Sequence, residues 1–186
     1  GQETFENVSQ SGQLFGRPTI LIVGALDLPQ CKKYRVSQKV EYFQSIGWDC
    51  HYCHYNDAQR TVSYLQISTA LIFYRVPSCA QFTEYLGEAA RLGVKTFYDI
   101  DDPIFNEAVY GENKNLEHIT PHERAHLLAS AEDYRGAMKS VDALILSTSY
   151  LQRLAQEDFG GRTYLWKNLV DSATLSIVRN LESERV

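Results

Sequence analysis

Apolar residues along the chain form short runs separated by stretches of helical periodicity. Six runs rich in Ile, Leu, Val and aromatic residues predict strands at residues 18–24, 48–55, 69–76, 94–100, 141–148 and 163–166. The main runs lack a regular polar alternation, which is typical of strands buried on both faces of a parallel sheet. Amphipathic stretches and capping residues predict helices at residues 35–46, 57–66, 80–92, 121–139, 149–158 and 173–184.

This alternation of strands and helices predicts an α/β fold. We expect a Rossmann-like three-layer sandwich, with a mostly parallel sheet of about six strands in the order 3-2-1-4-5-6 and helices on both faces. Residues 17–171 form the predicted domain, residues 1–16 a flexible N-terminal arm, and residues 172–186 a C-terminal or linker helix. Only Gly24 marks the first turn, so the G-x-G-x-x-G fingerprint is absent and we predict no NAD or FAD.

Residues 94–105 are the most informative stretch, because an apolar strand there runs directly into three carboxylates and a proline. Asp99, Asp101 and Asp102 fall at the carboxyl end of the predicted strand, and Pro103 prevents its continuation. Ligands of open α/β sheets bind at this edge. A single aspartate is more often a turn cap, but three together repel one another, which predicts that something bound relieves the repulsion.

Other candidate site residues fall at the same predicted edge of the sheet. Gly24 ends the first strand, Arg75 the third, and Ser147 and Thr148 the fifth. The polar segment 106–119 predicts a long loop that lines or covers a site.

Charge and composition exclude several classes of partner. The 186 residues carry a net charge of −5, with a pI near 5.5 and no basic stripe, which argues against nucleic-acid binding. The sequence has no apolar run long enough to span a membrane, and its polar N-terminus lacks the features of a signal peptide. We therefore expect a soluble cytoplasmic protein. Met138 is the only methionine, so we expect a processed or excised piece.

Two short motifs match metal or haem sites. Residues 50–54 read C-x-x-C-H, but residues three apart on a strand point to opposite faces and cannot hold one ion. His122, Glu123 and His126 match H-E-x-x-H, the zinc peptidase motif. Glu123 is also three residues after the predicted N-cap Thr120, where a capping box explains it without metal.

The chain resembles the N-terminal Rossmann-like domain of GT-B glycosyltransferases, above all the family 4-like enzymes of bacterial surface polysaccharide synthesis. The resemblance covers roughly residues 20–171. It rests on residues 34–36 (YRV) opening the first helix, Arg75, residues 98–105 (YDIDDPIF), and residues 142–148 (DALILST) before a helix with Tyr150 and Leu154. The exit turn, residues 167–171 (KNLVD), lacks the Pro and Gly of the family pattern.

This resemblance implies the acceptor-side half of an enzyme that moves a sugar from a nucleotide-sugar to an acceptor hydroxyl. The implied partners are a nucleotide-sugar donor, held by a C-terminal domain outside these residues, and a glycan or lipid-linked acceptor. A lipid-linked acceptor would bring the protein to a membrane surface. It implies no cofactor, no tightly bound metal and no activity for this half alone, although the D-I-D sequence leaves a Mg²⁺ site open as an alternative.

The resemblance also implies a set of substrate-binding residues. Arg35 and Arg75 would bind anionic groups of the acceptor or donor, because guanidinium forks match phosphate oxygens. Asp101 and Asp102 would accept hydrogen bonds from acceptor hydroxyls or hold the long loop in place. No catalytic residue is assigned. The predicted set is Gly24, Tyr34, Arg35, Arg75, Asp99, Asp101, Asp102 and Thr148. A non-catalytic carbohydrate- or protein-binding module and, more remotely, a zinc peptidase remain as alternatives.

We predict that the purified protein carries no stoichiometric zinc or haem. The reason is the opposed orientation of Cys50 and Cys53 and the position of His122 in a first helical turn. Elemental analysis after dialysis against a chelator tests this, and one retained equivalent of zinc would contradict both arguments.

Overall fold

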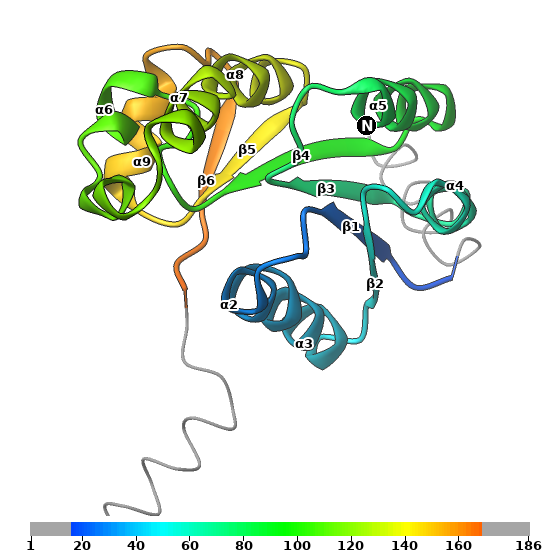
Figure 1. Ribbon diagram of the computed structural model, residues 1–186. Coiled ribbons are helices and arrows are strands. Elements are labelled where there is room, and N and C mark those ends of the chain that lie inside the picture. The colour runs from blue at the N-terminus through cyan, green and yellow to red at the C-terminus, as the bar shows by residue number, and fades with distance from the viewer. Residues whose placement is uncertain (1–15, 169–186) are drawn as a thin grey trace, which may run out of the picture.

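The computed structural model describes residues 16–168 and shows a six-stranded sheet in which every pairing is parallel. Figure 1 shows this sheet with helices on both faces, which confirms the predicted α/β, Rossmann-like three-layer sandwich. The strands are β1 (Thr19–Gly24), β2 (Asp49–His54), β3 (Ala70–Tyr74), β4 (Lys95–Ile100), β5 (Ala143–Leu146) and β6 (Arg162–Leu165).

The strand order is β2-β1-β3-β4-β5-β6, so the expected order 3-2-1-4-5-6 is wrong. After β2 the chain crosses at once to the other side of β1, instead of adding a third strand outside β2. β1 therefore pairs with both β2 and β3, at Ile22 with Tyr52 on one side and Ile72 on the other. The order reverses between β1 and β3, which is where open α/β sheets form a ligand crevice.

Helices connect the strands. They are α2 (Pro29–Cys31), a π-helical segment η1 (Lys32–Ser37), α3 (Gln38–Ser45), α4 (Ala58–Leu65), α5 (Ala80–Leu92), α6 (Glu107–Gly111), a 3₁₀ segment η2 (Lys114–His118), α7 (Pro121–Ala129), α8 (Ala131–Lys139) and α9 (Ser149–Gln156). Within residues 16–168, no helix combines the length and apolar character that crossing a bilayer requires. The helix expected at 173–184 and nearly all of the expected arm lie outside the described residues.

The two faces of the sheet build separate cores. On one face, α4, α5, α8 and α9 pack residues such as Leu65, Phe82 and Leu151 against strand residues that include Phe73 and Tyr98. On the other face, the continuous helix α2–η1–α3 packs Val36 and Val40 against Ile22 and Ile72. In Figure 1 this helix lies on the opposite side of the sheet from the others.

Three helical predictions need correction. The first helix starts at Pro29 and not at Arg35, because proline is favoured in the first helical turn, where its missing N–H has no partner to lose. Segment 106–119 is not a structureless loop: it contains α6 and η2, capped by the side chains of Asn106 and Asn113. The helix predicted at 121–139 is broken at Ser130, which ends α7 and precedes α8.

We predict that Gly24→Ala destabilises the protein by about 1–3 kcal/mol, since a methyl group there meets a packed neighbour. A Cβ on Gly24 would lie 3.1 Å from both the Cβ and the carbonyl oxygen of Tyr74. Gly87→Ala, in the exposed face of α5 with no atom within 4 Å of the new Cβ, is the matched control.

Urea unfolding of both variants measures the difference. Gly87→Ala should be neutral or more stable by up to about 1 kcal/mol, because alanine favours helix. Equal destabilisation by the two substitutions would contradict the packing argument.

Candidate functional site

A cleft of about 560 Å³ opens at the carboxyl edge of the sheet, at the point where the strand order reverses. The loop after β1 supplies one wall through Ala25, Asp27 and Leu28, and Arg75 at the end of β3 lies opposite. The connections from β1 and β3 leave to opposite faces of the sheet, so the two strand ends part and leave the crevice between them.

Segments far along the chain complete the cleft. Its remaining walls come from the start of the π-helical connection and from the region between β4 and β5. They are formed by Cys31, Ile104, Tyr110, Ile119, Leu127, Ser130 and Tyr134. Segment 106–119 thus does line a cavity, although as short helices rather than a loop.

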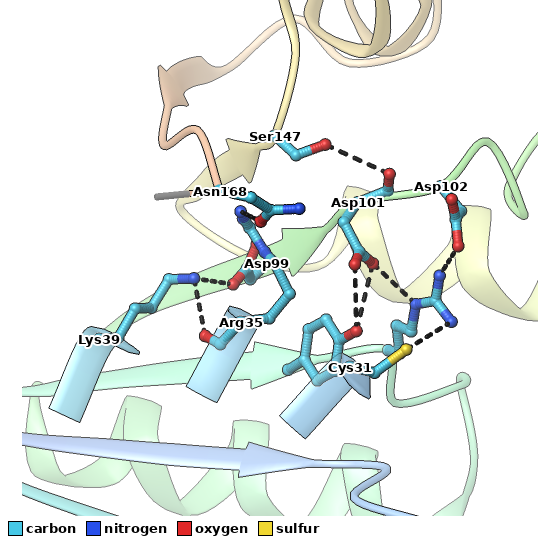
Figure 2. A network of polar contacts seen from close by, with 10 residues as sticks. Cys31, Arg35, Lys39, Asp99, Asp101, Asp102, Ser147 and Asn168 are labelled. Carbon is cyan, nitrogen blue, oxygen red and sulfur yellow. Dashed lines mark hydrogen bonds and ion pairs between the residues drawn. The ribbon is translucent and has the colours of Figure 1, made fainter. Parts of the chain in front are cut away.

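Arg75 connects the cleft to the carboxylates that follow β4. Its backbone adopts a φ of +51°, the left-handed region that residues other than glycine rarely occupy. Its Nε donates to Asp101 Oδ1 at 2.8 Å, its Nη2 pairs with Asp102 Oδ2, and its Nη1 lies 3.7 Å from Cys31 Sγ. Dashed lines in Figure 2 mark these contacts at Asp101, Asp102 and Cys31. Such uncommon backbone conformations cluster at functional sites.

Asp101 is held from three sides. Besides Arg75, the Tyr74 hydroxyl donates to its carboxylate at 3.2 Å, and Ser147 Oγ donates to its backbone carbonyl at 3.2 Å. Burial raises the pKa of Tyr74, so the phenol keeps the proton that it donates. Burial acts to lower the pKa of Arg75, but Asp101 and other neighbours outweigh it and the pKa is raised. Asp102 is half exposed and is the carboxylate of this group that solvent reaches.

A second ionic cluster lies buried next to the group formed by Arg75, Asp101 and Asp102 (Figure 2). Asp99, on β4, pairs with Arg35 of η1 and with Lys39 of α3, whose Nζ lies 2.5 Å from Asp99 Oδ2. The three side chains are 0–1% exposed. Arg35 Nη1 also donates to the backbone oxygen of Trp166 at 2.6 Å and to Asn168 Oδ1 at 3.0 Å. Arg35 therefore joins the first helix to β4 and to the segment that leaves β6.

This buried cluster holds two cationic side chains and one carboxylate. Burial lowers the pKa of Lys39, and the charge of Arg35 lowers it further, while Asp99 opposes both effects. Lys39 also donates to the backbone oxygen of Arg35 at 2.8 Å, and its ammonium lies 5.2 Å from the centre of the Trp166 ring. Lys39 is the least costly member of the cluster to remove, because Arg35 and Asp99 balance each other without it.

The structure divides the predicted site residues into three groups. Arg75 lines the cleft and pairs with Asp101 and Asp102 beside it, whereas Arg35 and Asp99 pair with each other away from solvent. The other three are not part of either cluster. Gly24 packs against Tyr74, Thr148 caps α9 by accepting from Leu151 N at 3.1 Å, and Tyr34 is exposed with the Lys33 ammonium 5.6 Å from its ring centre.

The expected repulsion among the three aspartates is relieved within the protein. Asp99 has Arg35 and Lys39 as partners, and Asp101 and Asp102 share Arg75. A bound ligand is therefore not required to offset their charges, and the argument for a site rests on the cleft beside them.

Sequence reasoning missed Lys39 and the aromatic walls of the cleft. Lys39 follows Arg35 by four residues and lies on the same side of the helix, which is a signal that the pattern does contain. Tyr110 and Tyr134 carry no such signal, because only the packing of α6 and α8 brings them to Arg75.

The C-x-x-C-H and H-E-x-x-H motifs lie on β2 and α7 respectively. Cys50 packs into the core on one face of the sheet and Cys53 into the core on the other, which confirms their predicted opposition. Burial raises the pKa of Cys50 to about 12, which disfavours the thiolate that metals bind. Glu123 forms the predicted capping box with Thr120. Residues 16–168 contain no group of three or more His, Cys, Asp or Glu side chains placed to hold a metal ion.

No model of a known protein family matches the chain, and no curated protein matches it either.

We predict that Asp99→Asn lowers the free energy of unfolding by about 3–5 kcal/mol, because it leaves two buried cations without their counter-charge. Lys39→Met should cost no more than about 1–2 kcal/mol, since the pair of Arg35 and Asp99 stays neutral and methionine occupies much of the same volume. Urea unfolding at pH 7 measures both, with exposed Asp49→Asn as the control. Equal losses for Asp99→Asn and Lys39→Met would contradict this division of roles.

Proposed function

We propose that the chain is the acceptor-side domain of a glycosyltransferase that moves a sugar from a nucleotide-sugar to an acceptor hydroxyl. One observation carries the proposal. Asp101 and Asp102 of the D-I-D-D segment lie against Arg75, which lines a cleft where the strand order reverses. Ligands of open α/β sheets bind there, and the segment is one of those on which the resemblance to GT-B enzymes rests.

The side chains around the cleft suit a polyhydroxylated acceptor. Carboxylates accept hydrogen bonds from hydroxyl groups, and Asp102 is exposed enough to do so. Tyr110 and Tyr134 add aromatic surface that can cover the C–H face of a sugar ring. Asp101, already bound by Arg75 and Tyr74, would act as a positioning residue that holds the guanidinium and so orients Asp102.

The donor half of the reaction falls outside the described residues in this proposal. Arg35 links Asp99 of β4 to Trp166 and Asn168, at the point where the described residues end. A donor-binding domain that follows would therefore be connected to β4 through Arg35 and Asp99. In this proposal the domain described here, residues 16–168, positions the acceptor, and none of its residues is assigned as a catalytic base.

The proposal predicts a specific kinetic effect for Asp102→Asn in the full-length protein. A panel of nucleotide-sugars and glycan acceptors identifies turnover, and the variant should raise the KM for the acceptor about ten-fold. It should leave the melting temperature nearly unchanged, because Asp102 is half exposed. Asp49→Asn, at the opposite edge of the sheet, is the matched control and should change neither quantity.

The outcomes separate the proposal from its alternative. Glycan binding without turnover of any nucleotide-sugar would favour a non-catalytic carbohydrate-binding module. An unchanged KM in Asp102→Asn would remove this cleft from acceptor binding.

A further inference from the structure

The cleft offers an anionic ligand little positive charge. Among the described residues that line it, Arg75 is the one Lys or Arg. All three nitrogen atoms of its guanidinium already face a partner, namely Asp101, Asp102 and the Cys31 sulfur. A phosphate would therefore have to displace both carboxylates before it could bind the edge of the guanidinium formed by Nε and Nη2.

The opposite wall adds another negative charge. Asp27 lines the cleft with its side chain 77% exposed, and its Oδ2 lies 3.2 Å from His54 Nε2. His54 Nδ1 accepts from the backbone N–H of Asn56 at 3.1 Å, so the neutral ring carries its proton on Nε2 and donates it to Asp27. Three carboxylates, those of Asp27, Asp101 and Asp102, therefore lie in or beside the cleft with the one guanidinium of Arg75, and these four groups carry a formal net charge of −2.

The remaining walls favour an uncharged ring with polar edges. Tyr110 and Tyr134 stand among the aliphatic side chains of Leu28, Ile104 and Leu127. Burial raises the pKa of Tyr134 although Arg75 opposes the shift, so its phenol stays neutral. A carboxylate oxygen accepts hydrogen bonds from hydroxyl groups, and it accepts stronger ones from ammonium groups, which carry a positive charge.

We propose that the cleft binds a sugar without negative charge, and an amino sugar more tightly than a neutral one, while it discriminates against phosphorylated and carboxylated sugars. This inference rests on the proposed function and narrows its acceptor class. It also changes the role expected for Arg75, which holds Asp101 and Asp102 in place rather than binding phosphate.

The test compares ligands that share one ring and differ in charge. Methyl glucoside, glucosamine and glucose 6-phosphate are titrated separately into the full chain, and binding is followed by the ¹H–¹⁵N shifts of the residues that line the cleft. We expect glucosamine to bind most tightly, methyl glucoside next, and glucose 6-phosphate at least about ten-fold more weakly than glucosamine. Raising the salt concentration should narrow this difference, because the cleft is open to solvent.

Asp27→Asn isolates the charge effect. It should reduce the affinity ratio of glucosamine to glucose 6-phosphate by about three- to ten-fold with little effect on methyl glucoside, whereas Asp49→Asn should leave the ratio unchanged. Binding of glucose 6-phosphate as tight as that of glucosamine would overturn the inference and leave the proposed function standing. Absence of cleft binding by all three sugars would count against the proposed function, and the inference would fall with it.

Discussion

The buried carboxylate of Asp99 is the constraint on which much of this structure depends. An ionised group without solvent costs several kcal/mol unless cations pair with it, and Arg35 and Lys39 are the cations that reach it. Both lie on the continuous helix of residues 29–45, so that helix must pack on the face of β4 from which Asp99 projects. The pairing thus holds the first crossover to the centre of the sheet, and the bonds from Arg35 to Trp166 and Asn168 add the end of β6 to the same unit.

The position of this helix determines where the cleft opens. The chain leaves β1 toward the face covered by residues 29–45 and leaves β3 toward the face covered by α5. Side chains from the connection between β4 and β5, such as Tyr110 and Tyr134, then line the space between the two strand ends together with the loop after β1. Two adjacent ionic clusters consequently serve different ends. Asp99 pairs with Arg35 and Lys39 inside the protein. Asp101 and Asp102 pair with Arg75, which lines the cleft.

This division affects how the carboxylates should be interpreted. Three aspartates within four positions suggest a single acidic site, yet each has a cationic partner and only Asp102 is substantially exposed. Arg75, whose backbone is left-handed, pairs with both Asp101 and Asp102, so its charge is already offset by these two carboxylates. The proposed discrimination against anionic ligands rests on this arrangement.

Much of the architecture was contained in the sequence because it depends on local patterns. Apolar runs located all six strands, and Thr120 with Glu123 marked the start of α7 through a capping box that needs only neighbouring residues. The direction in which the chain turns after β2 could not be read in this way, since the packing of helices on the two faces selects the strand order. The partners of the aspartates could not be predicted from local patterns either, because Arg35 and Asp99 are 64 residues apart and Arg75 and Asp101 are 26 residues apart. Contacts over such separations are decided by the tertiary structure, where burial of one charge requires another to be brought to it.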